Sequence, residues 1–269
     1  MRQDFNVDGP LEVDVRLGSG RIDATPSDPG TAWASVEAVD PTHEPSVRLA
    51  GQASIALDGE RLRVHVPDSG RIFRRAEIAV TLGLPARSGL AVKAGAADIT
   101  VVGGVEALAV KLGAGDVHVD EATSALAVKA GQTDVRVGVA GDVAVTTGQG
   151  SLKAERVNNA SFKTGQGSVQ LGRSDGAVAV KGGQVDLDIR ETGPGEVAFI
   201  TGSGSATIGV ATGTTVELDL LSGSGDVRCD LPLESSAPAG GAGLRLKLRT
   251  GSGDLRVAPA GGRVPSAGA

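Results

Sequence analysis

Hydrophobic and polar residues alternate along most of this chain, and the alternation recurs at a nearly constant interval. Three segments repeat one pattern: LAVKAGAADITV from Leu90, LAVKLGAGDVHV from Leu108 and LAVKAGQTDVRV from Leu126. A glycine marks the middle of each unit, and the interval between successive glycines is nearly constant except for a longer last one. Such a period indicates a stacked repeat architecture. The glycines are Gly95, Gly113, Gly131, Gly148, Gly165, Gly183, Gly202, Gly223 and Gly251.

Apolar residues occupy every second position on both sides of the glycine, which is the period of a β-strand. In the first unit these are Val92 before the glycine, and Ile99 and Val101 after it. The positions between them are mostly polar, as Lys93 illustrates. Each unit therefore predicts two short strands that meet at a glycine corner, with one side buried and the other in solvent.

A unit of this length cannot hold two strands and a crossover helix, so it must pair with the units above and below it. Parallel strands about 4.8 Å apart result. The sequence predicts an all-β fold, a parallel β-solenoid (β-helix) at 90–258. It should have about nine coils of roughly 17–21 residues each. We expect right-handed coiling, as is general for parallel connections, and coils that stack in chain order.

Two segments near the C-terminus break the repeat. A Ser/Ala/Pro/Gly-rich stretch at 234–243 accounts for the long last spacing and predicts a flexible loop between the final coils. The tail at 259–269 has no pattern. We expect this tail to be disordered, as chain ends without packing partners commonly are.

Residues 1–89 differ from the array and predict an N-terminal antiparallel β cap. The segment VRLGSGRID at 15–23 resembles one repeat unit that stands alone. The segments that follow it look antiparallel. Asp58-Gly59 lies between apolar-polar runs at 54–57 and 61–66, which is a strong hairpin signal.

Composition and charge exclude several classes of protein. The net charge of −6 argues against a nucleic-acid partner, which requires a basic face. Aromatic residues make up only 2% of the chain. An aliphatic, regular core is therefore expected, because irregular cores are usually filled by aromatic side chains. A single cysteine, Cys229, cannot form an internal disulfide. The first residues include an early acid and no apolar run behind it, so a cytoplasmic location is expected.

The repeated Lys-x-Gly-x-Gly-Asp-Val-x-Val pattern resembles the bacterial, actinomycete-type β-strand-repeat proteins of unknown function that are termed "putative adhesin". VRLGSG at 15–20 and TGSGDLRV at 250–257 extend the resemblance over nearly the whole chain. It implies a β-solenoid and no particular activity. More remotely, the short coil is similar to that of the bactofilins, which polymerise end to end.

Aspartate recurs three residues after the glycine, as in Asp98, Asp116 and Asp134. One interpretation is a cation-binding ladder, because calcium-binding repeats combine glycine-rich turns with aspartates. The favoured interpretation is turn chemistry, in which the side chain accepts nearby backbone N–H groups. Serine replaces aspartate in other units, which a carboxylate ligand would not tolerate. Lysine precedes the glycine in these same units, which suggests that ammonium groups offset repulsion between stacked carboxylates.

Hydroxyl residues stand directly before the glycine in the later units. They could line a groove for sugars or ice, but a corner ladder of mutually bonded hydroxyls is the favoured interpretation. These residues are Thr147, Thr164, Thr201, Ser222 and Thr250.

Other candidates for chemistry are weak. His43, His65 and His118 lie far apart in different contexts and predict no metal site. The Gly-x-Gly elements precede no helix that would supply a phosphate loop. Cys229 occupies an inward column and is expected to be an inert core thiol. We therefore assign no catalytic residue, metal ligand or cofactor site.

The sequence favours a non-enzymatic structural or protein-interaction scaffold that presents flat solenoid faces. The expected partner is another protein or a second copy, rather than nucleic acid, a membrane interior or a small molecule. Two alternatives stay open: a self-assembling, polymer-forming scaffold of the bactofilin kind, and a carbohydrate-binding or carbohydrate-active β-helix protein.

Overall fold

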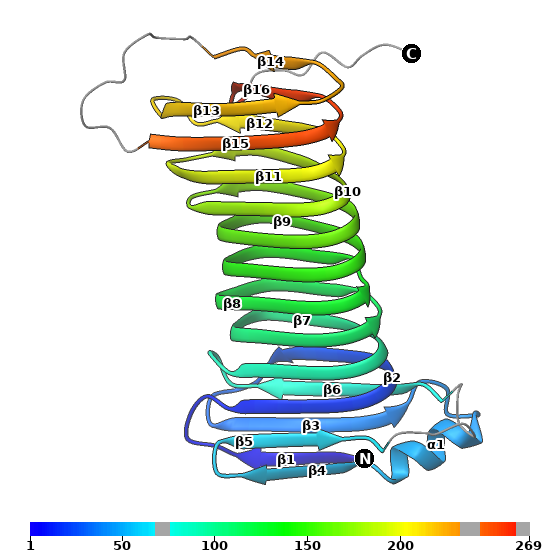
Figure 1. Ribbon diagram of the computed structural model, residues 1–269. Helices are drawn as coiled ribbons and strands as arrows, with labels where there is room; N and C mark the ends of the chain where they lie inside the picture. The colour runs from blue at the N-terminus through cyan, green and yellow to red at the C-terminus, as the bar shows by residue number, and fades with distance from the viewer. Residues whose placement is uncertain (68–75, 232–242, 262–269) are drawn as a thin grey trace. The chain divides into compact units, whose positions relative to one another are not determined.

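The chain folds almost entirely as β-strand (Figure 1). The computed structural model describes residues 1–67, 76–231 and 243–261. The loop expected at 234–243 lies outside the described residues apart from Gly243, and the expected tail lies outside them from residue 262 onward.

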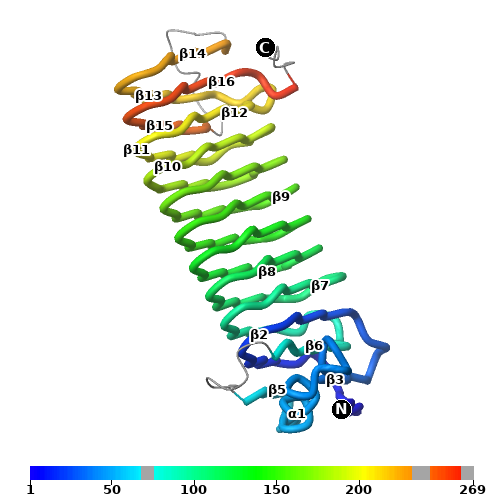
Figure 2. The backbone as a smooth tube through the Cα atoms, turned by 90° about the vertical axis from the view of Figure 1, so that its right-hand side faces the viewer, coloured from blue at the N-terminus to red at the C-terminus, as the bar shows by residue number. Residues whose placement is uncertain are grey.

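Two compact units make up the chain, Met1–Gly148 and Gln149–Ala269. In each unit, successive coils contribute one segment to a front layer, before the glycine corner, and one to a back layer, after it. Figure 2 shows these coils edge-on as flattened loops.

Three long strands form the coils of the first unit, and they pair in parallel in the order β2-β7-β8. In the front layer Val15 pairs with Val92, and Val110 pairs with Val128. In the back layer Ile22 pairs with Ile99. The predicted columns are thus stacked in register. The strands are β2 (Glu12–Pro26), β7 (Gly89–Ala114) and β8 (Val117–Gln132), and β9 (Val135–Ser174) begins in this unit.

The repeat-like segment near the N-terminus forms a complete coil, because β2 pairs with β7 from Glu12↔Gly89 to Ala24↔Val101. On its other side, β5 (Arg61–His65) and β6 (Ile78–Leu84) pair in parallel with the first and second halves of β2. Two strands distant in sequence therefore replace a continuous coil.

Antiparallel strands complete this end of the first unit. β4 (Ser54–Asp58) forms a hairpin with β5 across Asp58-Gly59, as the sequence predicts. β3 (Thr31–Ala38) pairs with β6, and β1 (Arg2–Asn6) pairs with β3.

One short helix, α1 (Glu44–Gly51), lies against β3, where the sequence analysis expected no helix. Pro45 stands in the first turn, where its missing N–H breaks no helical hydrogen bond. Ser46 is buried, and its hydroxyl accepts a hydrogen bond from the Glu77 N–H at 3.1 Å. This contact ties the helix to the segment that leads into β6.

The second unit departs from the expected stacking in chain order. Its front layer runs β9-β10-β11-β15-β13, so the later strand β15 lies between β11 and β13. In the back layer, β16 likewise lies between β12 and β14. The strands are β10 (Ala177–Thr192), β11 (Gly195–Ser203), β12 (Ala206–Val210), β13 (Thr215–Ser222), β14 (Val227–Cys229), β15 (Gly243–Ser252) and β16 (Leu255–Pro259).

The last two coils are therefore exchanged relative to the prediction, which is wrong on this point. Ile200 pairs with Arg249 rather than with Leu221, and Leu221 pairs with Arg249 on the other side. The alternating pattern permits this exchange, because every coil offers the same apolar columns to its neighbours.

Glycine is required at the corners because the coils approach closely there. Gly204 and Gly253 both have positive φ, at 131° and 137°, which residues with a side chain rarely adopt. A Cβ at Gly253 would also collide with the Gly204 carbonyl oxygen. The Gly-x-Gly elements thus serve to turn the chain at the corners.

Candidate interaction surface

The front layer of the first unit carries a column of exposed lysines on its outer side. Lys93, Lys111 and Lys129 each stand two residues before the corner glycine, and Lys111 pairs in register with Lys129. None of the three forms an ion pair or a side-chain hydrogen bond among the residues that the structure describes. Unit charges about 4.8 Å apart repel one another, so an anionic partner would relieve this repulsion.

The next residue in that column, Arg16, differs from the lysines because its charge is neutralised by a carboxylate. Arg16 pairs in register with Lys93. Its guanidinium donates to both carboxylate oxygens of Asp14 at 2.9 and 3.0 Å. That hydrogen bonding holds the pKa of Asp14 below its ordinary value and raises the pKa of Arg16. The three lysines, by contrast, have no carboxylate against them in the part of the chain that the structure describes.

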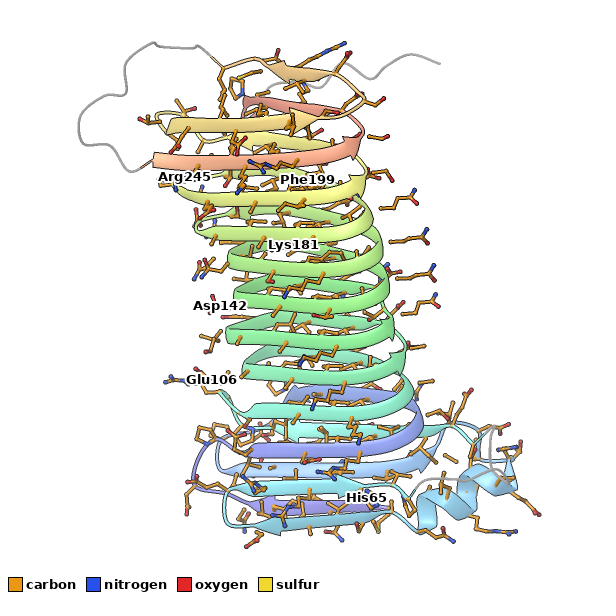
Figure 3. The ribbon with its side chains drawn as sticks, viewed as in Figure 1. His65, Glu106, Asp142, Lys181, Phe199 and Arg245 are labelled. Atoms are coloured by element: carbon orange, nitrogen blue, oxygen red, sulfur yellow. The ribbon has the colours of Figure 1, made fainter. Side chains whose placement is uncertain are left out.

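Small residues lie beside the lysine column, a feature that the sequence analysis did not single out. Ala91, Ala109 and Ala127 are exposed two residues before the lysines on the same outer side. Without long side chains, these positions form a flat floor along which another surface can approach the sheet. Figure 3 shows the outward side chains of the coils, with Lys181 of the second unit labelled on its front layer.

The aspartate column has a structural task in the corners. The Asp98 carboxylate accepts the Asp116 N–H at 3.0 Å, and the Asp116 carboxylate accepts the Asp134 N–H at 3.4 Å. Asp186 accepts the Ser205 N–H at 2.8 Å in the second unit. Each side chain thus supports the backbone of the next coil, as the turn-chemistry interpretation predicts. In the described ranges, no group of three or more acidic, histidine or cysteine residues could hold a metal ion.

The compensation expected between the lysine and aspartate columns does not take the form of ion pairs. Across the described parts of the chain, every ion pair takes its cation from arginine or histidine. Backbone N–H groups donate to the carboxylates of Asp98 and Asp116 instead.

The threonines of the hydroxyl column are buried, so they do not form a groove. Thr201 donates to the Ser203 carbonyl at 2.8 Å, and Thr250 donates to the Ser252 carbonyl at 3.0 Å. Thr164 donates to the Gln166 carbonyl at 2.8 Å. The expectation that hydroxyls satisfy one another is therefore wrong for Thr201 and Thr250. Their partners are corner carbonyls, which need a donor because buried backbone groups are rarely left unpaired.

The histidine and cysteine side chains form no metal-binding cluster among the described residues. The Nδ1 atom of His43 lies 2.8 Å from the Ser46 hydroxyl, and His118 lies 3.6 Å from the Asp120 carboxylate. Cys229 is half-buried rather than in the core, because β14 pairs only with β16 among the described strands.

A shallow depression of about 500 Å³ lies in the second unit. Arg190, Glu191 and Thr212 are the polar side chains among the described residues that line it. No histidine or cysteine is among these described lining residues.

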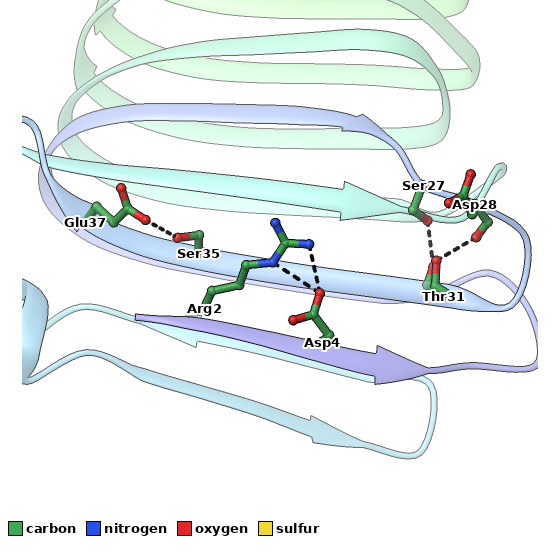
Figure 4. A network of polar contacts seen from close by, with 7 residues as sticks. All are labelled: Arg2, Asp4, Ser27, Asp28, Thr31, Ser35 and Glu37. Carbon is green, nitrogen blue, oxygen red and sulfur yellow. Dashed lines mark hydrogen bonds and ion pairs between the residues drawn. The ribbon is translucent and has the colours of Figure 1, made fainter.

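The cap of the first unit is rich in polar contacts (Figure 4). Arg2 on the edge strand β1 donates to Asp4 at 2.8 Å and lies 4.3 Å from the centre of the Trp33 ring. Ser35 donates to Glu37 at 2.8 Å. Charged and paired side chains therefore cover this edge.

A family model described as Toastrack DUF4097 matches residues 48–258. The chain belongs to the Toastrack DUF4097 family. This family accounts for the all-β, solenoid-like fold of repeated coils. No curated protein matches the chain.

Several solved structures are similar to this member of the Toastrack family. One is a "putative adhesin" from Bacteroides fragilis, with 15% identity, 96% of each chain covered and a TM-score of 0.42. A "Putative lipid binding protein" from Parabacteroides distasonis has 14% identity, covers 95% of this chain and 96% of its own, and has a TM-score of 0.39. A "putative adhesin" from the same organism has 10% identity, the same coverage and a TM-score of 0.36. None of these names describes an enzyme. No described helix is long and apolar enough to cross a membrane.

Proposed function

We propose that this Toastrack protein is a non-enzymatic interaction scaffold whose front layer binds another protein. The observation that carries the proposal is the column of Lys93, Lys111 and Lys129, which is exposed and unpaired among the described residues beside a floor of alanines. A flat face with repeated charge suits an extended partner surface, as solenoids commonly provide.

The test compares three forms of the full chain. In the first variant, Lys93, Lys111 and Lys129 are changed to glutamine, which removes charge and keeps most of the length. In the control variant, three exposed bases elsewhere are changed in the same way: Arg136, Lys153 and Arg156. Proteins captured from a bacterial extract are identified by mass spectrometry, purified and measured against each form by calorimetry.

We expect the lysine variant to lose at least tenfold in affinity for the purified partner, and the control variant to keep it. Equal affinities for both variants would refute the lysine face as the binding site. A partner that binds through this face should also bind more weakly as salt rises, because exposed charges are screened over about 8 Å at physiological ionic strength.

A self-assembling scaffold is a second candidate, because β13 pairs only with β15 among the described strands and so leaves one edge open, although the acids on that edge disfavour its pairing with a second β13. Electron microscopy over a range of concentrations separates the two: filaments favour self-assembly and isolated particles the first proposal. A carbohydrate role has less support, because Phe162 and Phe199, which lie in the coils, are fully buried. Right-handed coiling, a division near residue 89, an actinomycete-type origin and a cytoplasmic location stay predictions.

A further inference from the structure

The coil formed by β13 and β14 has one open side. Within the described residues, β13 pairs only with β15, and β14 pairs only with β16. The N–H and C=O groups on the other edge of β13 therefore have no strand partner there. This free edge runs over eight residues, which is long enough to template the addition of another strand.

The inward side of β13 is only partly covered. Val216, Leu218 and Leu220 are half-buried, whereas their register partners on β15 are fully buried: Leu244, Leu246 and Leu248. On β14, the exposed fraction of Val227 is 47%. The uncovered apolar surface continues along both layers of the same coil, so an added strand would bury aliphatic side chains as well as pair its backbone.

The outward side of β13 is acidic, and its neighbour β15 shows what kind of strand pairs with it. Arg245 on β15 donates to Glu217 at 3.0 Å, and Arg249 donates to Asp219 at 2.8 Å. β15 alternates leucine with basic residues, so its apolar side chains enter the core while its bases meet the acids of β13. The carboxylates can accept further hydrogen bonds from the opposite side, because each has about four acceptor sites.

The edge also lacks several of the features by which sheets discourage strand addition. β13 contains no proline, no lysine and no inward-pointing charge. The edge strands of the first unit differ: β1 and β4 are five residues long, and β1 carries an Arg2–Asp4 ion pair.

A second copy fits this edge poorly. If two β13 strands paired antiparallel about Leu218, Glu217 of one would face Asp219 of the other, and like charges directly opposite are destabilising. Neither β1 nor β4 alternates aliphatic with basic residues. The charge of the edge therefore favours a different protein.

We propose that the free edge of β13 accepts an extended segment of another protein, as an added strand whose residues alternate between aliphatic and basic. Its aliphatic side chains would cover Val216, Leu218 and Leu220, and its bases would lie beside Glu217 and Asp219. This site is distinct from the lysine face of the first unit.

The probe for this site is a fluorescein-labelled peptide with the sequence of residues 243–252, GLRLKLRTGS, measured by anisotropy against the full chain. A second peptide has glutamate in place of each base. We expect saturable 1:1 binding of the basic peptide and at least tenfold weaker binding of the acidic one.

Two protein variants locate the binding. Changing both Glu217 and Asp219 to lysine should weaken the basic peptide at least tenfold. The control is Glu196→Lys on β11, which lies in the same outward row but on a strand paired on both sides, and it should change the affinity less than twofold. Circular dichroism confirms that each variant is folded.

Three results would overturn the proposal. The two peptides could bind equally, or the Glu217/Asp219 variant could bind like the wild type. The chain could also form dimers in light scattering that the basic peptide does not dissociate, which would assign the edge to a second copy.

Discussion

Two neighbouring coils of the second unit share one sequence pattern but differ in burial. Leu248 on β15 and Leu220 on β13 occupy the same inward column and pair in register. Leu248 is fully buried, whereas Leu220 is half-buried. In the back layer, the exposed fraction is 0% for Leu255 on β16 and 47% for its partner Val227 on β14. Burial in this fold therefore depends on neighbours on both sides, and a favourable pattern alone does not provide it.

The same comparison predicts how stability is distributed. In a stacked array, each coil gains most of its stability from its interfaces with adjacent coils. The coil of β15 and β16 has two such interfaces, and the coil of β13 and β14 has one among the described strands. Changes in the first should cost more than equivalent changes in the second.

The largest difference is expected for the paired leucines. Leu248→Ala should lower the free energy of unfolding by about 2–5 kcal/mol, because it leaves a cavity between two coils. Leu220→Ala removes a side chain that is already partly in solvent, and should cost about 1 kcal/mol. Urea denaturation of both variants measures the difference. Equal losses would mean that β13 is as well enclosed as β15.

Glycine positions sharpen the comparison between packed corners and open turns. Gly253 combines a positive φ with a would-be Cβ that collides with the Gly204 carbonyl, so Gly253→Ala should cost about 3 kcal/mol or more. Gly213 also has a positive φ, at 81°. No described atom lies near its would-be Cβ, so Gly213→Ala should cost about 1 kcal/mol. Thermal unfolding of the two variants tests this order. A milder effect at Gly253 would show that the coils separate easily there.

Removing a buried hydroxyl should change the free energy of unfolding by a smaller amount, and in opposite directions at Thr201 and Thr133. Thr201 donates to the carbonyls of Ser203 and Gly183, so Thr201→Val should destabilise by about 1 kcal/mol. The Thr133 hydroxyl is buried without a partner among the described residues, so Thr133→Val should be neutral or stabilise by up to about 1 kcal/mol. Calorimetry of both variants measures whether each substitution stabilises or destabilises the fold. A destabilised Thr133→Val would indicate a hydrogen bond to that hydroxyl in solution.

The smallest effect is expected at the ion pairs that join β13 to β15. Asp219 and Arg249 lie 2.8 Å apart, but both side chains are close to half exposed. Asp219→Asn should therefore change the free energy of unfolding by about 0.5 kcal/mol or less, and even less at high salt. Urea denaturation at two salt concentrations measures it. A loss several times larger than exposed ion pairs usually give would show that charge, rather than packing, holds the terminal coil.

The repeat pattern contained most of the coil geometry. Val92, Ile99 and Val101 are buried in register with their counterparts, as the period of two requires. The Asp58-Gly59 hairpin was likewise predictable, because its turn chemistry is local. The aspartate column follows turn chemistry for the same reason.

The order of the last coils could not be read from the same pattern. Leu220 and Leu248 fit the same column equally well, so the alternation does not say which coil lies outermost. The short helix α1 was not predicted, because only eight residues form it; Pro45 stands in its first turn, where a proline is tolerated. The lysines were visible in the sequence, but that Lys93 and Lys111 lack ion-pair partners among the described residues followed only from the structure.

Hydrogen exchange of the unmodified chain tests the stacking order most directly, because amide protection reports which strands are enclosed. Peptides that cover β13, Thr215–Ser222, should exchange at least tenfold faster than peptides that cover β15, Gly243–Ser252. That result would place β15 between two strands and β13 at the open edge. Faster exchange in β15 than in β13 would mean that the coils stack in chain order, and would contradict both the exchanged topology and the free edge of β13.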